Sequence, residues 1–255
     1  MTVALLPCAE ATPVPARFAE GATRGFLVLR ATDGTAVAHG ELTQKLTGAT
    51  VTSRLRLNFK DGSVFDETLT FTQRKVFRLE SYHLVQRGPS LPACDIAFDR
   101  KSGQYRARTA SKPGGEEKQA AGRVDMPADL YNGMLLTVLK NVPADASPAS
   151  ATLLAFTPEP ILLQVSLGRE GEERLRVGPE AKPVSRYLVK FDIPGVKGAI
   201  ATLIGKDPPL IRYWIVNGSI PAFARFEGAM FLRGPVWRLE QAPLEWGREG
   251  AAARQ

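Results

Sequence analysis

The stretch NFKDGSVFDETLTFTQRKVFRLESYHLVQRGP, residues 58–89, decides the fold. Asp61-Gly62 suits a two-residue type I′ turn, in which both central residues need a positive φ. After the turn, Phe65, Leu69 and Phe71 alternate with acidic residues and threonines, which is typical of a sheet that is buried on one face and wet on the other. The stretch therefore predicts two successive β-hairpins of an antiparallel sheet and no active site.

The same alternation recurs outward from this stretch, between turn signals such as Asp33-Gly34 and Asn217-Gly218. Between Phe77-Leu79 and Tyr82-Leu84 the apolar residues change from odd to even positions, which predicts a β-bulge near Ser81 that bends the sheet. The expected strands cover residues 26–30, 35–45, 49–60, 63–73, 76–86, 93–99, 104–109, 151–157, 161–169, 173–177, 183–191, 209–216, 220–231 and 236–240.

One helix is expected at 127–140. Pro127 suits the first helical position, and Asp129 would complement the positive end of the helix dipole. Apolar residues then recur every four positions from Leu130 to Val138. This pattern predicts an amphipathic helix that covers the sheet.

The fold class is therefore mainly β with a minor α part. We expect a curved antiparallel sheet, arranged as a half-barrel or a large sandwich, with the one covering helix. Residues 112–118 read as a loop, and residues 195–204 are open to a short second helix or an apolar loop. The apolar content of 44% in 255 residues is enough for a sizeable core. We expect one β-rich domain at 23–246, a leader at 1–22 and a fraying tail at 247–255.

The leader contains a short apolar run followed by Ala9-Glu10-Ala11, a pattern that signal peptidase cuts. We interpret residues 1–22 as the remnant of a signal peptide and a linker, which places the protein in the periplasm or outside the cell. If the leader is not such a remnant, the location is cytoplasmic. Cys8 lies in the leader, so Cys94 would have no disulfide partner in the mature chain.

The chain carries a net charge of +7 with a sequence pI near 9.6. Its basic residues are spaced along predicted polar faces and turns, without exposed aromatics between them and without a recognition helix, so we expect no nucleic-acid partner. An anionic surface is the alternative partner for this charge. No run of apolar residues is long enough for a transmembrane segment.

Motifs that carry chemistry are missing from the sequence. It contains no G-x-S-x-G, H-E-x-x-H, C-x-x-C or G-x-G-x-x-G pattern. His39 and His83 have no companion at metal-ligand spacing, and Cys94 would be a nucleophile only if His83 lay beside it. We therefore expect no catalytic residue, no metal and no cofactor, and an enzymatic role is disfavoured.

Two features indicate a ligand-binding cleft. Glu67 shares the apolar face of its strand with Phe65 and Leu69, so it is paired, protonated, at a cavity mouth or at an edge open to water. The segment 212–240 concentrates aromatic residues that would line a cleft or pack the centre of the fold. The candidate ligand-binding residues are Glu67, Tyr213, Trp214, Phe223, Arg225, Phe226 and Glu227.

Several motifs resemble a group of uncharacterised bacterial cell-envelope β-rich domains of unknown function. The matching motifs are Asp61-Gly62-Ser63 with Asp66-Glu67-Thr68, Gln86-x-Gly88-Pro89, Pro127-x-Asp129-Leu130-x-Asn132-Gly133, Trp214-Ile215, Gly218 and Pro221-Ala222-Phe223-x-Arg225-x-Glu227-Gly228. More distantly, the layout is similar to the half-barrels of periplasmic lipoprotein and lipid carriers.

The resembled group carries no known activity, so no functional residue is transferred from it. By analogy with the fold of those carriers alone, we expect a non-enzymatic envelope protein that binds a lipid-like or other apolar molecule in a cleft between sheet and helix. The alternative is a structural or protein-interaction module of the envelope, with an envelope protein as its partner, and a hydrolase is the third possibility.

Overall fold

The structure is a computed structural model of the chain and describes residues 13–143, 149–157, 159–177, 180–192 and 210–242. The start of the leader, the segment 195–204 that was open to a second helix and the tail at 247–255 lie outside the described residues.

Within the described residues, fourteen strands form one antiparallel sheet, in the order β8-β7-β6-β5-β4-β3-β2-β1-β14-β13-β12-β11-β10-β9. The chain adds strands outward from β1 to β8, crosses through α1 to the far edge at β9, and then works back to β14, which pairs with β1. The strands are β1 Thr23–Arg30, β2 Ala36–Thr47, β3 Thr50–Phe59, β4 Val64–Gln73, β5 Phe77–Arg87, β6 Cys94–Asp99, β7 Gln104–Ala110, β8 Glu117–Arg123, β9 Ala149–Phe156, β10 Pro160–Val177, β11 Glu180–Asp192, β12 Ile211–Val216, β13 Ala222–Gly228 and β14 Trp237–Gln241.

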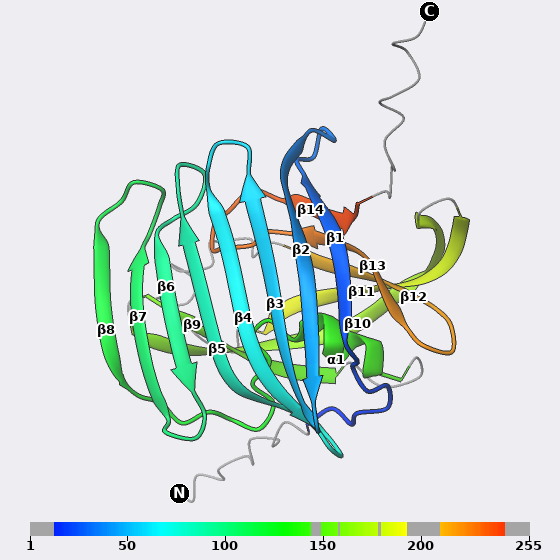
Figure 1. Cartoon of the computed structure of the whole chain (residues 1–255), viewed down its shortest axis with the longest axis horizontal. Coiled ribbons are helices and arrows are strands. Elements are labelled where there is room, and N and C mark those ends of the chain that lie inside the picture. The colour runs from blue at the N-terminus through cyan, green and yellow to red at the C-terminus, as the bar shows by residue number, and fades with distance from the viewer. Residues whose placement is uncertain (1–12, 144–148, 158, 178–179, 193–209, 243–255) are drawn as a thin grey trace, which may run out of the picture.

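The sheet curves over on itself without closing. In Figure 1 strands β2–β8 lie in front, and strands β9–β12 cross behind them. The edge strands are β8 and β9, and no ladder joins them in the part of the chain that the structure describes. Nearby, the ring of Tyr105 on β7 lies 5.4 Å from that of Phe156 on β9, and its hydroxyl donates to Glu159 at 3.3 Å. The predicted curved antiparallel sheet is therefore confirmed, as an open, barrel-like sheet.

The main core lies between the two halves of the sheet, around the helix α1, Leu135–Asn141. Val138 and Leu139 of the helix pack in one cluster with Phe71 of β4 and Val165 of β10. A second cluster centres on β1–β4, β13 and β14 and includes Leu57. We call the face that carries these clusters the inner face.

The helix is shorter than the sequence predicts, because it begins at Leu135 and not near Pro127. The preceding residues run beside β9: the backbone N–H of Thr152 donates to the Asp129 carbonyl at 2.9 Å, and the Thr152 hydroxyl donates to the Asp129 carboxylate at 2.7 Å. Gly133 then takes a φ of +68°, which interrupts a helical path. Asp129 is therefore a partner of β9 and does not complement the helix dipole, so that part of the prediction is wrong.

The hairpin at Asp61-Gly62 forms with a different turn from the predicted one. Gly62 has a φ of +86°, but Asp61 does not have a positive φ, so the turn is not type I′. The N–H of Gly62 donates to the Phe59 carbonyl at 3.1 Å, which closes a three-residue loop over 60–62. At Asn217-Gly218 neither residue has a positive φ, and a longer loop joins β12 to β13.

Three further features of the strands compare with the prediction as follows. The predicted bulge is present, since Thr70 pairs with Ser81 while Phe71 pairs with Leu79. The expected strands 161–169 and 173–177 are one strand, β10, with a register shift near Gly171. The strand β8 was not predicted, because it is an exposed edge strand whose polar residues show no alternation.

Residues 13–22, which the sequence assigns to the leader and linker, pack against the domain. Val14 is 5% exposed, and its N–H donates to the Tyr131 hydroxyl at 2.9 Å. The Phe18 N–H donates to the Asn141 side chain at 2.6 Å, at the end of α1. The carboxylate of Glu20, which is also buried, forms an ion pair with Lys140 of the helix.

Candidate functional site

A cleft of about 760 Å³ opens on the inner face of the sheet. One wall is formed by β5–β8 with the residues between them, a second by Asn132 and β9, and a third by residues 230–233 in the loop between β13 and β14. The volume is in the range of small-molecule sites, which is about 300–1,000 Å³. Segments far apart in the sequence therefore come together around this space.

Strand register arranges the first wall in rows, because directly opposite residues on neighbouring strands lie side by side on one face. The apolar row consists of Leu84, Ile96, Ala107 and Ala120. The polar row beside it consists of Gln86, Cys94, Thr109 and Lys118. Leu84, Ile96 and all four members of the polar row line the cleft. The cleft thus has an apolar strip next to a strip of hydrogen-bonding groups.

Gln86 is the most deeply placed member of the polar row. It is 4% exposed, and its amide group has no hydrogen-bond partner in the part of the chain that the structure describes. Among the described residues, the fully enclosed side-chain polar atoms that lack a hydrogen-bond partner are Oε1 of Glu20 and Nε of Arg238, so the amide of Gln86 still touches solvent in the cleft. A molecule in the cleft would therefore take over hydrogen bonds that water makes with this amide.

Cys94 and His83 do not form a catalytic pair. Cys94 lines the cleft on the inner face, and burial followed by the nearby Asp95 charge raises the pKa of its thiol to about 12. His83 lies on the outer face, where its Nε2 is 3.0 Å from the Asp95 carboxylate. His39 is an exposed residue of β2. The thiol therefore stays neutral at physiological pH and lacks the base that would activate it.

Glu67 lies on the inner face, as its register with Phe65 and Leu69 predicts, directly opposite Leu84 of the apolar row. The Tyr82 hydroxyl donates to one carboxylate oxygen at 2.7 Å. Burial raises the pKa of Glu67, and the hydrogen bond from Tyr82 opposes that rise. Burial, with the nearby Glu67 charge, also raises the pKa of Tyr82 well above its ordinary value. Among the alternatives open from the sequence, the carboxyl is hydrogen-bonded inside the protein and not at a wet edge.

Three of the aromatic candidates point into the interior. The rings of Tyr213 and Phe226 contact each other at 5.1 Å, and Phe223 packs on the same inner cluster. Burial first, and then the charge of Glu67, raise the pKa of Tyr213. These residues form an apolar interior together with Glu67, but none of the four lines the cleft itself.

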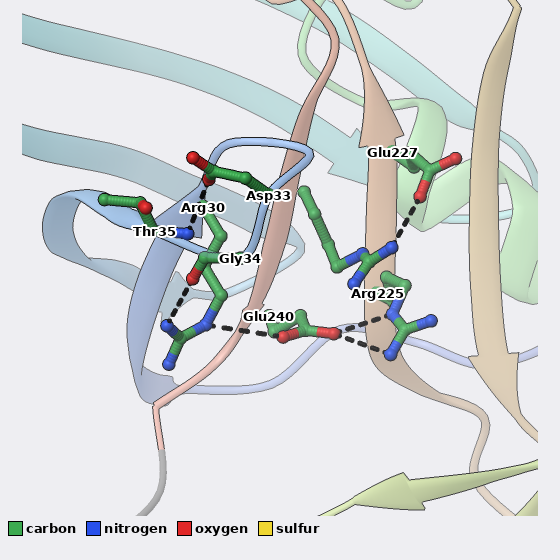
Figure 2. A network of polar contacts seen from close by, with 8 residues as sticks. Arg30, Asp33, Gly34, Thr35, Arg225, Glu227 and Glu240 are labelled. Atoms are coloured by element: carbon green, nitrogen blue, oxygen red, sulfur yellow. Dashed lines mark hydrogen bonds and ion pairs between the residues drawn. The ribbon is translucent and has the colours of Figure 1, made fainter.

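The other three candidates lie on the outer face. The Trp214 indole donates to Glu173 at 2.5 Å, and the guanidinium of Arg225 lies 5.5 Å from the centre of the Trp214 ring. Arg225 also donates to Glu240 at 2.7 Å, and Glu240 approaches Arg30 at 3.9 Å (Figure 2).

Glu227 belongs to the same outer face, where it accepts a hydrogen bond from Arg238 at 3.3 Å. Neighbouring residues of a strand point to opposite faces, so the structure divides the seven candidate residues between two sides of the sheet.

The sequence reasoning missed the polar row and Met230; it included Phe231 in the aromatic segment 212–240, but in an expected strand and not among the candidate ligand-binding residues. A signal for Gln86 was present, because it continues the alternation of Tyr82 and Leu84 after the bulge. Like Glu67, Gln86 is a polar residue on the apolar face of its strand. No local pattern marks the loop at 230–233, since its position depends on the ring contact of Phe231 with Trp237 at 5.9 Å.

Two kinds of feature are absent from the described residues. They contain no group of three or more histidine, cysteine, aspartate or glutamate side chains that would hold a metal ion. No helix among them has the length and apolar character needed to cross a bilayer.

Comparison with known proteins gives a distant structural likeness. No family model matches the chain, and no curated protein matches it. Among solved structures, it is similar to a beta-barrel-like protein of the domain of unknown function DUF1849 from Brucella abortus. That likeness has a TM-score of 0.43 and 9% sequence identity, and it covers 86% of this chain and 95% of the other. At this level it assigns neither a family nor an activity.

Proposed function

We propose that the protein is a non-enzymatic binding protein that holds a lipid-like or other apolar molecule in the cleft. The observation that carries this proposal is a cleft of about 760 Å³ that has an apolar strip beside a glutamine amide with no hydrogen-bond partner among the described residues. The interior formed by Glu67, Tyr213, Phe223 and Phe226 borders the apolar strip, because Glu67 lies directly opposite Leu84.

The apolar side chains of the cleft support the proposal energetically. Leu84, Ile96, Met230 and Phe231 line the cleft and are only half-buried. Covering apolar surface contributes about 25 cal/mol per Å², so a hydrocarbon chain laid against these four residues would be stabilised without any rearrangement of the sheet. Water in the cleft provides no such stabilisation.

The first experiment is purification of residues 12–255 without detergent, followed by native and denaturing mass spectrometry. A retained lipid-like mass that disappears on denaturation is expected. Binding of the neutral fluorescent probe N-phenylnaphthylamine measures the same cleft in stripped protein. A clean apo mass together with no saturable probe binding would overturn the proposal.

A matched pair of variants locates the binding. Leu84→Trp fills the cleft, whereas Val85→Trp places the same bulk one residue further on, on the outer face of β5. We expect Leu84→Trp to abolish probe binding and Val85→Trp to preserve it. Equal binding by both variants would place the ligand elsewhere.

The second candidate function is an interaction module of the cell envelope, and the edge strand β8 favours it. Its outer edge pairs with no other strand in the described part of the chain, so a partner strand would be able to add there. Glu117, Lys118 and Arg123 place charges along this short strand, a device that protects edges from non-specific pairing. A stable complex in pull-downs from an envelope fraction, with no retained lipid, would favour this function.

Location outside the cytoplasm is part of the proposal and is supported by the pattern Ala9-Glu10-Ala11. Fractionation of cells that express the full chain tests it. A chain found in the cytoplasm with Met1 still attached would contradict it.

A further inference from the structure

We propose that the ligand of this cleft carries an uncharged hydrogen-bonding group, such as an amide, ester or hydroxyl, next to its apolar part, and that Gln86 binds this group. The inference rests on the proposed function and specifies the ligand class. It follows from the geometry of the polar row.

The polar row offers neutral groups where the cleft is deepest. Gln86 presents an amide that both donates and accepts, and directly opposite it on β6 is the thiol of Cys94. Thr109 adds a hydroxyl on β7. The apolar row with Leu84 and Ile96 lies next to the polar row on the same face, because Leu84 and Gln86 are two residues apart on β5. A chain lying on the apolar row would bring a polar group attached to it within reach of Gln86.

Charged groups of the cleft lie at its mouth. In the described residues, the charged side chains that line it are Glu116, Lys118 and Arg233, and all three are exposed. Lys118 ends the polar row, three strands from Gln86, which at about 4.8 Å per strand is roughly 14 Å away. A carboxylate beside Gln86 would therefore be partly desolvated, and the polar row offers it no cation nearer than Lys118. The surroundings of Gln86 therefore disfavour an anionic group of a ligand.

The nearest acidic groups reinforce this selection. Cys94 is neutral at physiological pH, because burial raises the pKa of its thiol. Glu67 lies at the end of the apolar row and has a raised pKa, so any charge it carries is negative and repels an anionic ligand end. Neither group would stabilise a carboxylate, whereas both tolerate an alcohol or an amide.

The test is a competition series in the full chain. Decanol, decanamide and decanoate share one apolar chain and differ in the polar end, and each displaces bound N-phenylnaphthylamine at about pH 8, where decanoate is ionised. We expect decanol and decanamide to bind roughly tenfold more tightly than decanoate. Decanoate that binds as tightly as the neutral ligands would overturn the inference while leaving the proposed function intact.

Variants assign the preference to Gln86. Gln86→Leu keeps the volume and removes the amide, and should weaken decanol and decanamide roughly fivefold while leaving the probe bound. Thr109→Val changes the same row without touching the buried amide and should have a smaller effect. Gln119→Leu makes the same chemical change as Gln86→Leu on the exposed outer face of β8 and serves as the control.

The outcomes separate the two proposals. A preference for the neutral ligands that survives Gln86→Leu, in a variant with the parent's circular dichroism and melting temperature, would overturn the assignment to Gln86. An absence of saturable probe binding in the parent chain would overturn the proposed function and this inference together.

Discussion

Replacement of Gly133 with alanine should destabilise the protein by about 2–4 kcal/mol. Gly133 has a φ of +68°, a left-handed conformation that costs a residue with a Cβ atom roughly 1 kcal/mol. The added Cβ would lie 2.4 Å from Cδ2 of Leu69 and 3.0 Å from the carboxyl carbon of Glu67. Leu69 is 3% exposed, and overpacking a core of this kind typically costs about 1–3 kcal/mol. The two costs act at one site and add.

Gly114→Ala is the matched control for this prediction. Gly114 has a φ of +64°, and nothing lies within 4 Å of the position that an alanine methyl group would take there, so the variant should lose only the roughly 1 kcal/mol of conformational cost. Urea unfolding followed by circular dichroism gives both free energies of unfolding. Combining Gly133→Ala with Leu69→Val should cost less than the sum of the two, because valine lacks the atom that overlaps. Equal losses for Gly133→Ala and Gly114→Ala would refute the claim that the core at Leu69 and Glu67 is tightly packed.

Three further predictions concern buried titratable groups. Because the pKa of Glu67 is raised in the folded protein, its contribution to stability is complete below the unfolded pKa and is lost as the pH rises through the folded pKa. Glu67→Gln should therefore match the parent at about pH 4 and be more stable than the parent at neutral pH. A difference in the free energy of urea unfolding that does not change with pH would contradict this. With Cys8→Ser in place, Cys94 should react with iodoacetamide at about pH 8 roughly a thousandfold more slowly than a free thiol, and a fast reaction followed by mass spectrometry would show the thiol to be exposed. Glu20→Ala should cost about 2 kcal/mol because it leaves the Lys140 ammonium, 15% exposed, without its partner, and adding Lys140→Met should restore more than half of that loss in the same assay.

Alternation predicted strands well wherever one face is buried and the other is wet. Strands β3–β5 follow this rule, since Leu57 and Phe71 are fully buried while their neighbours face outwards, where Arg56 pairs with Asp66, and Thr70 and Thr72 form side-chain hydrogen bonds. The rule fails for β8, because both faces of this strand are exposed to water. Apolar and polar residues alternate only where one face is buried and the other is not. The helical spacing also overpredicts the helix, because residues 127–134 form turns that are held to β9 by Asp129 and bury apolar residues without being helical.

The candidate site was predictable only in part, because local pattern does not say which face of a strand is the inner one. Tyr213 and Trp214 are adjacent aromatic residues, and either would satisfy an aromatic-lined cleft. Adjacent residues of a strand point to opposite faces, so only one of the two faces inwards, and the pairing of Tyr213 with Phe226 shows which one. Gln86 was within reach of sequence reasoning, but its missing partner is a property of the assembled sheet.

The open edge of the sheet and the cleft have a common physical origin. A closed barrel would join β8 to β9 with a ladder of backbone hydrogen bonds, and separating such a ladder would be costly. In the described chain the contacts near this gap are between side chains, namely the ring pair of Tyr105 and Phe156 and the hydrogen bond from Tyr105 to Glu159. Each contributes on the order of 1 kcal/mol. Phe156 also lines the cleft, so the edge at which the sheet stays open is at the same time a wall of the cleft. β9 is held there by its hydrogen bonds to Asp129, Tyr131 and Asn132, which a closed β8–β9 ladder would have to replace or accommodate.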